Sequence, residues 1–273
     1  MDIAAPSRIG GFMMLEADIT KAWIGHKTIL QDVSFRAVAG QFTAIVGPNG
    51  AGKSSLLKAI TNEIDFSGHV RFNGEDAGLA RPWELAAIRG VLPQSTTLAF
   101  PFTVIEVVRM GLLSGHSGQR DHLPDTALAR VGLEGYSHRL YQELSGGEQQ
   151  RVQLARVLCQ VWDPVDPADT PHWLLLDEPV ASLDIGHQLM VMRLLKDYAV
   201  RGGGVVAVMH DLNLSAMFAD HMVMVVEGSI LSAGTPQEVM TDDVLSQAYG
   251  CTLRVNQAPR DNRSFILPHV AAV

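Results

Sequence analysis

The sequence has few cysteines and no long apolar run. Its two cysteines, Cys159 and Cys251, lack metal-ligand spacing, and so few thiols do not indicate a disulfide framework, as is usual in a reducing compartment. The most apolar stretches, such as VVAVM and MVMVV, are far shorter than the roughly 20 residues needed to cross a bilayer. The opening stretch MDIAAPSRIGGFMMLEAD also lacks the charged start and long apolar region of an export signal. These absences predict a globular protein that neither spans a membrane nor is exported.

An excess of positive charge is missing as well. The chain has 21 Lys and Arg against 29 Asp and Glu, a net charge of -8, without the basic stripe that attracts a nucleic-acid backbone. We therefore expect no nucleic-acid partner. Hydrophobic residues, in contrast, make up 47% of the 273 positions, which is ample for the core of one or two domains.

A glycine-rich motif directly follows a short apolar run. The run QFTAIV predicts a strand, and GPNGAGKSSLLKAI predicts a turn and a helix that match the pattern G-x-x-x-x-G-K-[ST]. Gly47, Gly50 and Gly52 let the backbone N–H groups point inward at the helix start, where the helix dipole favours a polyphosphate. Lys53 would reach its β- and γ-phosphates and Ser54 would ligate Mg²⁺. A glycine turn that only caps a helix is the alternative, and Lys53 and Ser54 in register argue against it.

A second apolar run ends in two carboxylates. Residues 173–176 of WLLLDEP predict a strand buried on both faces of a parallel sheet, with Asp177 and Glu178 at its carboxyl end, where such sheets bind ligands. Asp177 is placed to contact Mg²⁺, usually through water, and Glu178 to act as the general base on the attacking water. The pair alone is a weak signal, but together with the P-loop (residues 47–54) it becomes strong.

A third motif, ELSGGEQQRVQLARVL, offers another helix start. The Ser145 hydroxyl and the N–H groups of Gly146 and Gly147 could bind a second phosphate, while apolar residues at helical spacing bury the helix that follows. An ordinary N-cap explains the same residues equally well. Two phosphate cradles in one chain would need an explanation that these residues alone do not give.

The motifs GPNGAGKS, LSGGEQ and LLLDEP, in this order, resemble those of ATP-binding subunits of ABC transporters, and the resemblance covers roughly residues 14–250. It implies an α/β fold with a P-loop (RecA-like) parallel sheet core, an antiparallel β subdomain and an inserted α-helical subdomain. We expect one nucleotide-binding domain over residues 1–273, with the helical subdomain at about 95–160 and a loosely attached tail at about 252–273. In this family two subunits pack head to tail, and the Ser-Gly-Gly helix of each closes over its partner's ATP. A homodimer is therefore implied.

The resemblance also implies the roles of individual residues. Gln94 in VLPQ resembles the glutamine that touches Mg²⁺ and the attacking water, His210 resembles the histidine that contacts the γ-phosphate, and SLD (residues 182–184) resembles the loop that communicates across the dimer. The implied catalytic residues are Glu178, His210 and Gln94. The implied metal ligands are Ser54, Gln94 and Asp177. The implied nucleotide-binding residues are Gly47, Pro48, Asn49, Gly50, Ala51, Gly52, Lys53, Ser54, Ser55, Trp23, Ser145, Gly146, Gly147, Glu148 and Asp184.

An aromatic ring upstream of the P-loop stacks on adenine in this family, and Trp23 in ITKAWIGHKTIL is the candidate. Its spacing to TIL differs by about a residue from that of common members, so Ile24 is the alternative. An aromatic residue at a strand edge can also serve packing alone.

The stretch CQVWDPVDPADTPHWLLLDEP contains four prolines and four aspartates. Because proline lacks a backbone donor and Asp-Pro favours turns, residues 163–171 should be neither helix nor strand. This insertion (residues 160–172), with SLDIGHQ and the segment that begins HDLNLSAMF, is similar to the motors of bacterial haem (hemin) importers within the iron-chelate and vitamin B12 group. A siderophore or cobalamin importer is the next hypothesis, and a tolerated surface insertion is the simplest explanation of the loop itself.

The family resemblance implies ATP and Mg²⁺ as cofactors and a peripheral location on the cytoplasmic face of the bacterial inner membrane. The implied partners are two permease subunits, contacted near Pro101, Phe102 and Thr103, and a periplasmic substrate-binding protein that acts through them. A non-transport ABC ATPase is the alternative, but those generally carry two nucleotide modules or a long coiled coil, and this chain has one P-loop and no heptads. A regulatory nucleotide-binding module without turnover is opposed by Glu178 and His210.

Overall fold

A six-stranded sheet forms the centre of the protein. The computed structural model describes residues 8–9, 12–96, 98–114, 120–258, 264 and 266–267. The strand order is β11-β10-β4-β9-β8-β7, and all neighbours pair in parallel except β10 and β11. The strands are β4 (Phe42–Val46), β7 (Arg89–Leu92), β8 (Trp173–Asp177), β9 (Gly204–Val208), β10 (His221–Val226) and β11 (Ser229–Gly234). Every residue of β4, β8 and β9 is buried, which explains their continuous apolar sequences.

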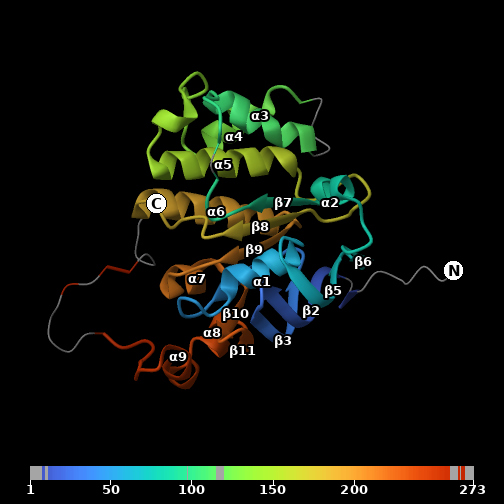
Figure 1. Ribbon diagram of the computed structural model, residues 1–273. Helices are drawn as coiled ribbons and strands as arrows, with labels where there is room; N and C mark the ends of the chain where they lie inside the picture. The colour runs from blue at the N-terminus through green and yellow to red at the C-terminus, as the bar shows by residue number, and fades with distance from the viewer. Residues whose placement is uncertain are drawn as a thin grey trace.

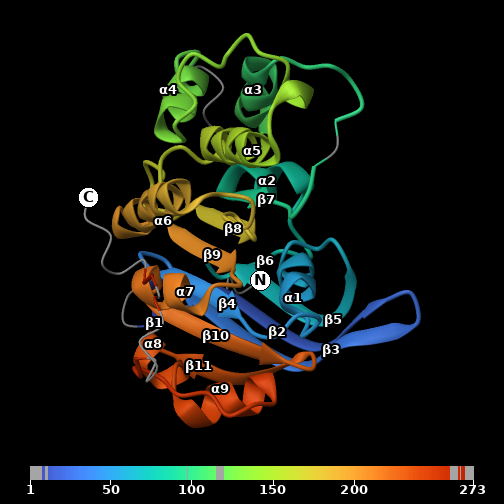
Figure 2. The same cartoon turned by 90° about the vertical axis from the view of Figure 1, so that its left-hand side faces the viewer.

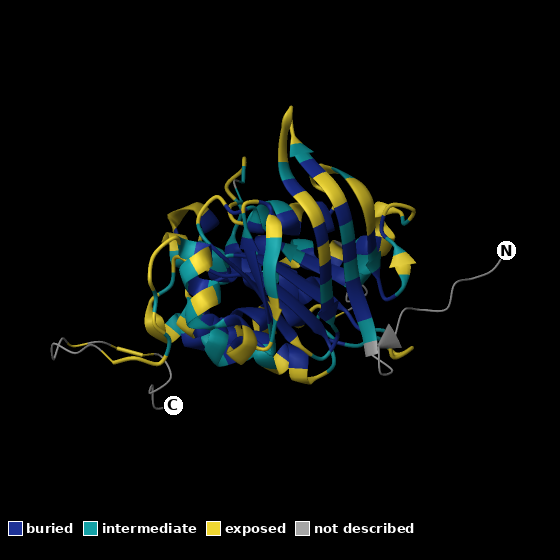
Figure 3. Cartoon of the chain, turned by 90° about the horizontal axis from the view of Figure 1, so that it is seen from below, coloured by how far each residue is buried: buried dark blue, intermediate teal, exposed yellow. Residues whose placement is uncertain are grey.

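A second, antiparallel sheet confirms the β structure predicted before and after the P-loop. Its strands are β1 (Arg8–Ile9), β2 (Phe12–Ile24), β3 (Lys27–Val38), β5 (Asp65–Phe72) and β6 (Glu75–Asp76). The long strand β2 pairs with both β3 and β5, and β5 and β6 form a hairpin within the stretch SGHVRFNGED. Figure 3 shows the dark blue central strands and the exposed tip of the β2–β3 hairpin, residues 24–28.

The helices divide between the sheet and a separate group. They are α1 (Lys53–Ile60), α2 (Pro82–Ile88), α3 (Val104–Ser114), α4 (Leu123–Arg130), α5 (Gly146–Gln160), α6 (Ile185–Val200), α7 (Leu212–Phe218), α8 (Pro236–Val239) and α9 (Asp242–Tyr249), with a 3-10 turn at Tyr141–Glu143. Helices α3, α4 and α5 gather at one end of the molecule, away from the antiparallel sheet (Figures 1 and 2). They lie within the range expected for a helical subdomain, whose limits remain a prediction. No helix within the described ranges has the length and apolar character that a membrane crossing requires.

Alternate residues of the parallel strands supply two cores. Leu174 and Leu176 of β8 belong to the core that contains α3, α4 and α5, whereas Trp173 and Leu175 belong to the core shared with α1 and the antiparallel sheet. This alternation follows from the two-residue period of a strand. The strand that carries the predicted carboxylates is therefore packed tightly from both sides.

The insertion between α5 and β8 is a folded loop attached to the antiparallel sheet. As expected, no named helix or strand lies in residues 163–171, where an isolated bridge joins Val165 to Pro171. The side-chain amide of Asn73 donates to the Pro171 carbonyl oxygen at 3.0 Å, and Trp173 Nε1 donates to Asn73 Oδ1 at 3.0 Å. Asn73, which follows β5, therefore fixes the junction between the insertion and β8.

The first residues of the predicted tail contact the helix that precedes it, and the limits of the tail stay a prediction. Residues 253–255 are not loose, because the Leu253 N–H donates to Ser246 Oγ at 3.0 Å and the Val255 N–H donates to Asp242 Oδ1 at 2.7 Å. Both acceptors belong to α9. This attachment is made by polar side chains of the helix, Ser246 and Asp242. Most of residues 259–273 lie outside the described residues.

The cysteines are free thiols, as predicted. Cys159 is fully buried in the core of α5, and burial raises the pKa of its thiol to about 12. Cys251 is exposed.

We predict that Asn73→Gly lowers the free energy of unfolding by about 2–4 kcal/mol, because the buried Trp173 N–H and Pro171 carbonyl each lose a partner. Glycine keeps the left-handed backbone of this position, where φ is 54°. Asn62→Gly is the matched control, since Asn62 has φ of 60° and one amide contact but is exposed. Denaturant unfolding of both variants tests this, and equal losses would contradict the role of Asn73.

Candidate active site

Four of the predicted motifs lie at the same edge of the parallel sheet. The P-loop follows β4, the two carboxylates end β8, His210 follows β9 and Gln94 follows β7. Because β7, β8, β9 and β4 are consecutive parallel neighbours, their carboxyl ends meet at one edge. The fold thus brings together residues that are far apart in the sequence.

The P-loop turns sharply between β4 and α1. Gly47 has φ of 145°, and a Cβ there would lie 2.1 Å from the Val225 carbonyl oxygen, so a side chain is excluded. Lys53 is the first residue of α1, and its Nζ donates to the Gly47 and Pro48 carbonyl oxygens, both at 2.9 Å. Burial lowers the pKa of Lys53, against the attraction of the Glu178 and Asp177 carboxylates. No side chain caps the start of α1, so its N–H groups are available to an anion.

Ser54 and Asp177 form an oxygen pair beside the P-loop. Ser54 Oγ donates to Asp177 Oδ1 at 2.9 Å, and Asp177 is only 3% exposed. Burial raises the pKa of Asp177, and the Ser54 hydrogen bond partly offsets this. A hydroxyl and a carboxylate at contact distance suit Mg²⁺, which prefers oxygen ligands and takes few from protein when phosphates supply the others. The two residues therefore fit this metal.

Glu178 accepts contacts from both remaining motifs. Gln94 Nε2 donates to Glu178 Oε1 at 3.0 Å, and His210 Nε2 lies 2.6 Å from the same oxygen. The Glu178 side chain is 15% exposed, whereas the His210 side chain is 44% exposed. Neither contact involves Oε2. Gln94 and His210 thus orient one oxygen of the carboxylate and leave the other for a proton.

The backbone of Glu178 is strained. Its φ is 54°, a left-handed conformation that non-glycine residues adopt rarely and that is common at functional sites. The Glu178 N–H donates to the Val208 carbonyl oxygen at 3.1 Å, which fixes the residue against β9. The strain turns the side chain out of the strand direction at the point where β8 ends.

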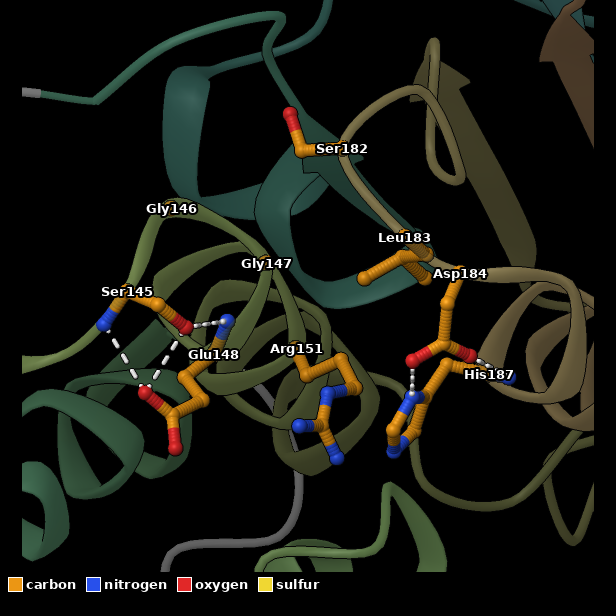
Figure 4. Close-up of a pocket in the computed structure, with 9 residues that line it drawn as sticks. All are labelled: Ser145, Gly146, Gly147, Glu148, Arg151, Ser182, Leu183, Asp184 and His187. Atoms are coloured by element: carbon orange, nitrogen blue, oxygen red, sulfur yellow. Dashed lines mark hydrogen bonds and ion pairs between the residues drawn. The ribbon is translucent and has the colours of Figure 1, made fainter.

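The third motif forms a separate pocket of about 510 Å³ (Figure 4). It is lined by Ser145, Gly146, Gly147, Glu148, Arg151, Ser182, Leu183, Asp184 and His187. None of these belongs to the P-loop. The structure therefore places Ser145, Gly146, Gly147, Glu148 and Asp184 together, but it does not bring them to the nucleotide-binding residues of the same chain.

Within one chain, Ser145 is an N-cap. Its Oγ accepts from the Glu148 N–H at 3.3 Å, while the Ser145 N–H and hydroxyl both donate to Glu148 Oε2 at 2.8 Å. This is a capping box. The bonds from Ser145 lower the pKa of Glu148. A phosphate-binding role of Ser145 stays a prediction.

Sequence analysis missed two residues of this pocket. Arg151 lies one helical turn after Gly147, and its Nη1 donates to the Val131 carbonyl oxygen at 2.9 Å. His187 Nδ1 lies 2.8 Å from Asp184 Oδ2, and the His187 N–H donates to Asp184 Oδ1 at 2.9 Å. These bonds lower the pKa of Asp184. The sequence did contain a signal for both residues, since Arg151 follows Gly147 by four positions and His187 follows Asp184 by three, and residues at these spacings are neighbours on a helix.

Trp23 lies near the P-loop at the end of β2. It pairs with Thr28 of β3, and the adjacent Ile29 carbonyl oxygen lies 3.6 Å from where a Cβ on Gly52 would be. Trp23 is half-buried, while Ile24 is 52% exposed. Both positions suit a contact with a base held by the P-loop, so the choice between them is still open.

The segment after Gln94 presents an aromatic residue that we did not predict. Pro101 is exposed, but Phe102 packs against the helical core and Thr103 Oγ1 donates to Glu106 Oε2 at 2.7 Å. Phe100, which contacts Phe102 edge to face, is instead 71% exposed. Local sequence does not distinguish these two phenylalanines, because their difference depends on packing against the core.

The sequence is similar to known ATP-binding proteins of ABC transporters. Residues 30–181 match the ABC transporter family. The chain is 58% identical over 258 residues to the hemin import ATP-binding protein HmuV of Jannaschia sp. (strain CCS1), covering 94% of this chain and 95% of that protein. It is 52% identical over 261 residues to the HmuV of Rhizobium etli (strain ATCC 51251 / DSM 11541 / JCM 21823 / NBRC 15573 / CFN 42), covering 94% and 98%.

Solved structures share the fold. A dimeric ATP-binding cassette in a post-hydrolysis state, bound to ADP and Pi, matches with a TM-score of 0.70 at 26% identity, covering 82% of this chain and 99% of that chain. An ATP-binding cassette of an ABC transporter in its ADP conformation matches with a TM-score of 0.70 at 22% identity, covering 87% and 97%. The predicted fold class, a P-loop α/β core with an antiparallel sheet, is thus confirmed.

We predict that Glu178→Gln keeps nucleotide affinity within about twofold but lowers the rate of ATP turnover by roughly 10²- to 10⁴-fold, since an amide cannot accept the proton of water. Binding of a fluorescent ATP analogue and steady-state phosphate release measure the two effects. Turnover near that of the wild type would remove Glu178 as the base.

For the adenine contact, we expect Trp23→Ala to weaken ATP binding by about 5- to 100-fold, since stacking on an aromatic ring contributes about 1–3 kcal/mol. Ile24→Ala is the matched control and should change the affinity by less than about threefold. Unchanged affinity in Trp23→Ala, with a loss in Ile24→Ala, would move the contact to Ile24.

Proposed function

Since the chain belongs to the ABC transporter family of ATP-binding subunits, we propose that it is the ATP-hydrolysing subunit of a bacterial hemin importer. The cargo is supported by relatives at 52 to 58% identity that are hemin import proteins and that match almost end to end. Hydrolysis is supported best by the Glu178 carboxylate, held by Gln94 and His210 beside the P-loop. A siderophore or cobalamin importer is the alternative cargo assignment.

The P-loop would bind the phosphates of ATP. The uncapped N–H groups at the start of α1 and the positive charge of Lys53 favour the β- and γ-phosphates. Trp23 or Ile24 would hold the adenine. Residues 47–55 supply the turn and the first helical residues that surround the phosphate chain.

Glu178 would act as the general base. Its carboxylate accepts a proton from water, and the water oxygen then bonds to the γ-phosphorus. The bond from this phosphorus to the bridging oxygen breaks, giving ADP and phosphate. Gln94 and His210 keep the carboxylate in one orientation, so that little reorganisation is needed at the moment of reaction.

Ser54, Asp177 and Gln94 would hold Mg²⁺ together with phosphate oxygens. Bound there, the metal would neutralise charge that develops on the transferred phosphoryl group. The buried Asp177 carboxylate is the residue of this set that carries charge.

A homodimer would complete each site. The pocket at Ser145 is separate from the P-loop of its own chain, so the capped start of α5 could face the γ-phosphate on a partner. The dimeric cassette bound to ADP and Pi, which shares the fold, supports this arrangement. We treat residues 1–273 as one nucleotide-binding domain with a helical subdomain at about 95–160.

Two permease subunits and a periplasmic substrate-binding protein would complete the importer. The chain would lie peripherally on the cytoplasmic face of the bacterial inner membrane. The exposed Phe100, next to Pro101 and Phe102, suits contact with an apolar partner surface. The insertion is attached to Asn73, which follows β5 of the antiparallel sheet, and we assign it no role in binding the cargo.

The decisive measurement is the ATPase activity of this subunit, reconstituted in lipid with the permease encoded beside its gene. We expect a substrate-binding protein loaded with hemin to stimulate the activity at least about threefold, and Glu178→Gln to abolish the stimulated rate. The unloaded binding protein is the control.

Stimulation by a ferric siderophore or cobalamin, with no response to hemin, would keep the mechanism and overturn the cargo. Absence of ATPase activity in any of these mixtures would overturn the motor function itself.

A further inference from the structure

Gln150 joins α5 to the backbone of the proposed base. It lies on α5, five residues after Ser145, and its Nε2 donates to the Glu178 carbonyl oxygen at 2.6 Å. Its Oε1 accepts from the Ser182 N–H at 3.3 Å. One side chain therefore bridges the helix of the third motif, the residue after Asp177 and the first residue of the SLD loop.

The contact is made where two backbones approach closely. A Cβ on Gly147 would lie 2.8 Å from the Ser182 carbonyl oxygen, so only glycine lets α5 come this near to the loop. At that distance the amide of Gln150 reaches both of its partners. The close approach of Gly147 to Ser182 thus allows the two hydrogen bonds of Gln150.

The bridge acts on the strained residue of the site. Glu178 has φ of 54°, and its N–H is bonded to Val208 in β9. Its carbonyl oxygen accepts the short bond from Gln150 and a turn bond from the Ala181 N–H at 3.3 Å. Because an unusual backbone conformation persists only when its surroundings fix it, the bonds at both ends of Glu178 are what hold its side chain in position.

We propose that Gln150 is a positioning residue for Glu178 and that it acts within its own chain. This proposal rests on the proposed function, in which the start of α5 serves the ATP of a partner. Gln150 then ties the helix that works at one ATP site to the base that works at the other. A movement of α5 would therefore shift the backbone of Glu178 through the Gln150 side-chain amide.

Gln153 provides a matched control on the same helix. Its Nε2 donates to the Tyr141 hydroxyl at 3.2 Å, and its Oε1 accepts from Arg156 Nε at 2.8 Å. These contacts stay within the helical group and do not involve residues 178–182. Replacement of either glutamine by methionine keeps a similar shape but removes the hydrogen bonds.

We expect Gln150→Met to lower the maximal ATPase rate of the dimer in its permease complex about tenfold and to change KM for ATP by less than about twofold. Gln153→Met should lower the unfolding midpoint but leave the maximal rate within about twofold. Equal rate losses in the two variants, or a rise in KM without loss of rate, would contradict a positioning role.

Mixed dimers separate action within the chain from action on the partner. One subunit carries Glu178→Gln, so only the site with the intact Glu178 turns over. Gln150→Met in the subunit with the intact base should lower the rate about tenfold, whereas Gln150→Met in the other subunit should have less than about a twofold effect. The opposite pattern would mean that Gln150 acts through the start of α5 on the partner's ATP.

Hydrogen exchange of the full chain alone tests the same bond without ATPase activity. Exchange of the Ser182 N–H should be at least about fivefold faster in Gln150→Met than in the wild type or Gln153→Met. Unchanged exchange would overturn the proposal. A wild-type dimer without ATPase activity would count against the proposed function, while faster exchange would still support the bridge.

Discussion

Parallel pairing of β7, β8, β9 and β4 is the constraint on which the rest of the molecule depends. Successive parallel strands all end at the same edge, and the residues that follow them must therefore meet, although 157 positions separate Lys53 from His210 in the sequence. The helices and the second sheet pack against the parallel sheet and bury both of its faces. The position of the motif residues at this edge thus follows from the parallel pairing of the four strands.

 The motif residues lie at two places in the chain. The P-loop and the residues after β7, β8 and β9 meet at the sheet edge, and Ser145 with the SLD loop lines a separate pocket. Within one chain a capping box between Ser145 and Glu148 closes the start of α5. Each chain thus carries two groups of motif residues, and the Gln150 side chain joins them through the Glu178 carbonyl oxygen and the Ser182 N–H.

Local patterns were enough to predict much of this. The P-loop turn, the buried strand β8 and the hairpin of β5 and β6 follow from glycine placement and apolar periodicity, which act over a few neighbouring residues. The contacts that sequence analysis missed join distant positions. Gln150 reaches Glu178, α9 holds residues 253–255, and Phe102 packs against the core whereas Phe100 is exposed. No short window of sequence contains both partners of such contacts, so only the folded arrangement reveals them.

The place of the insertion determines where a change in its length would act. Asn73 fixes the insertion at the amino end of β8, and the five residues of that strand separate it from Asp177 by about 17 Å. Packing from both sides holds the strand in place between these ends. A change in the length of this loop therefore acts at the amino edge of the sheet, one strand length away from the carboxylates at its carboxyl edge.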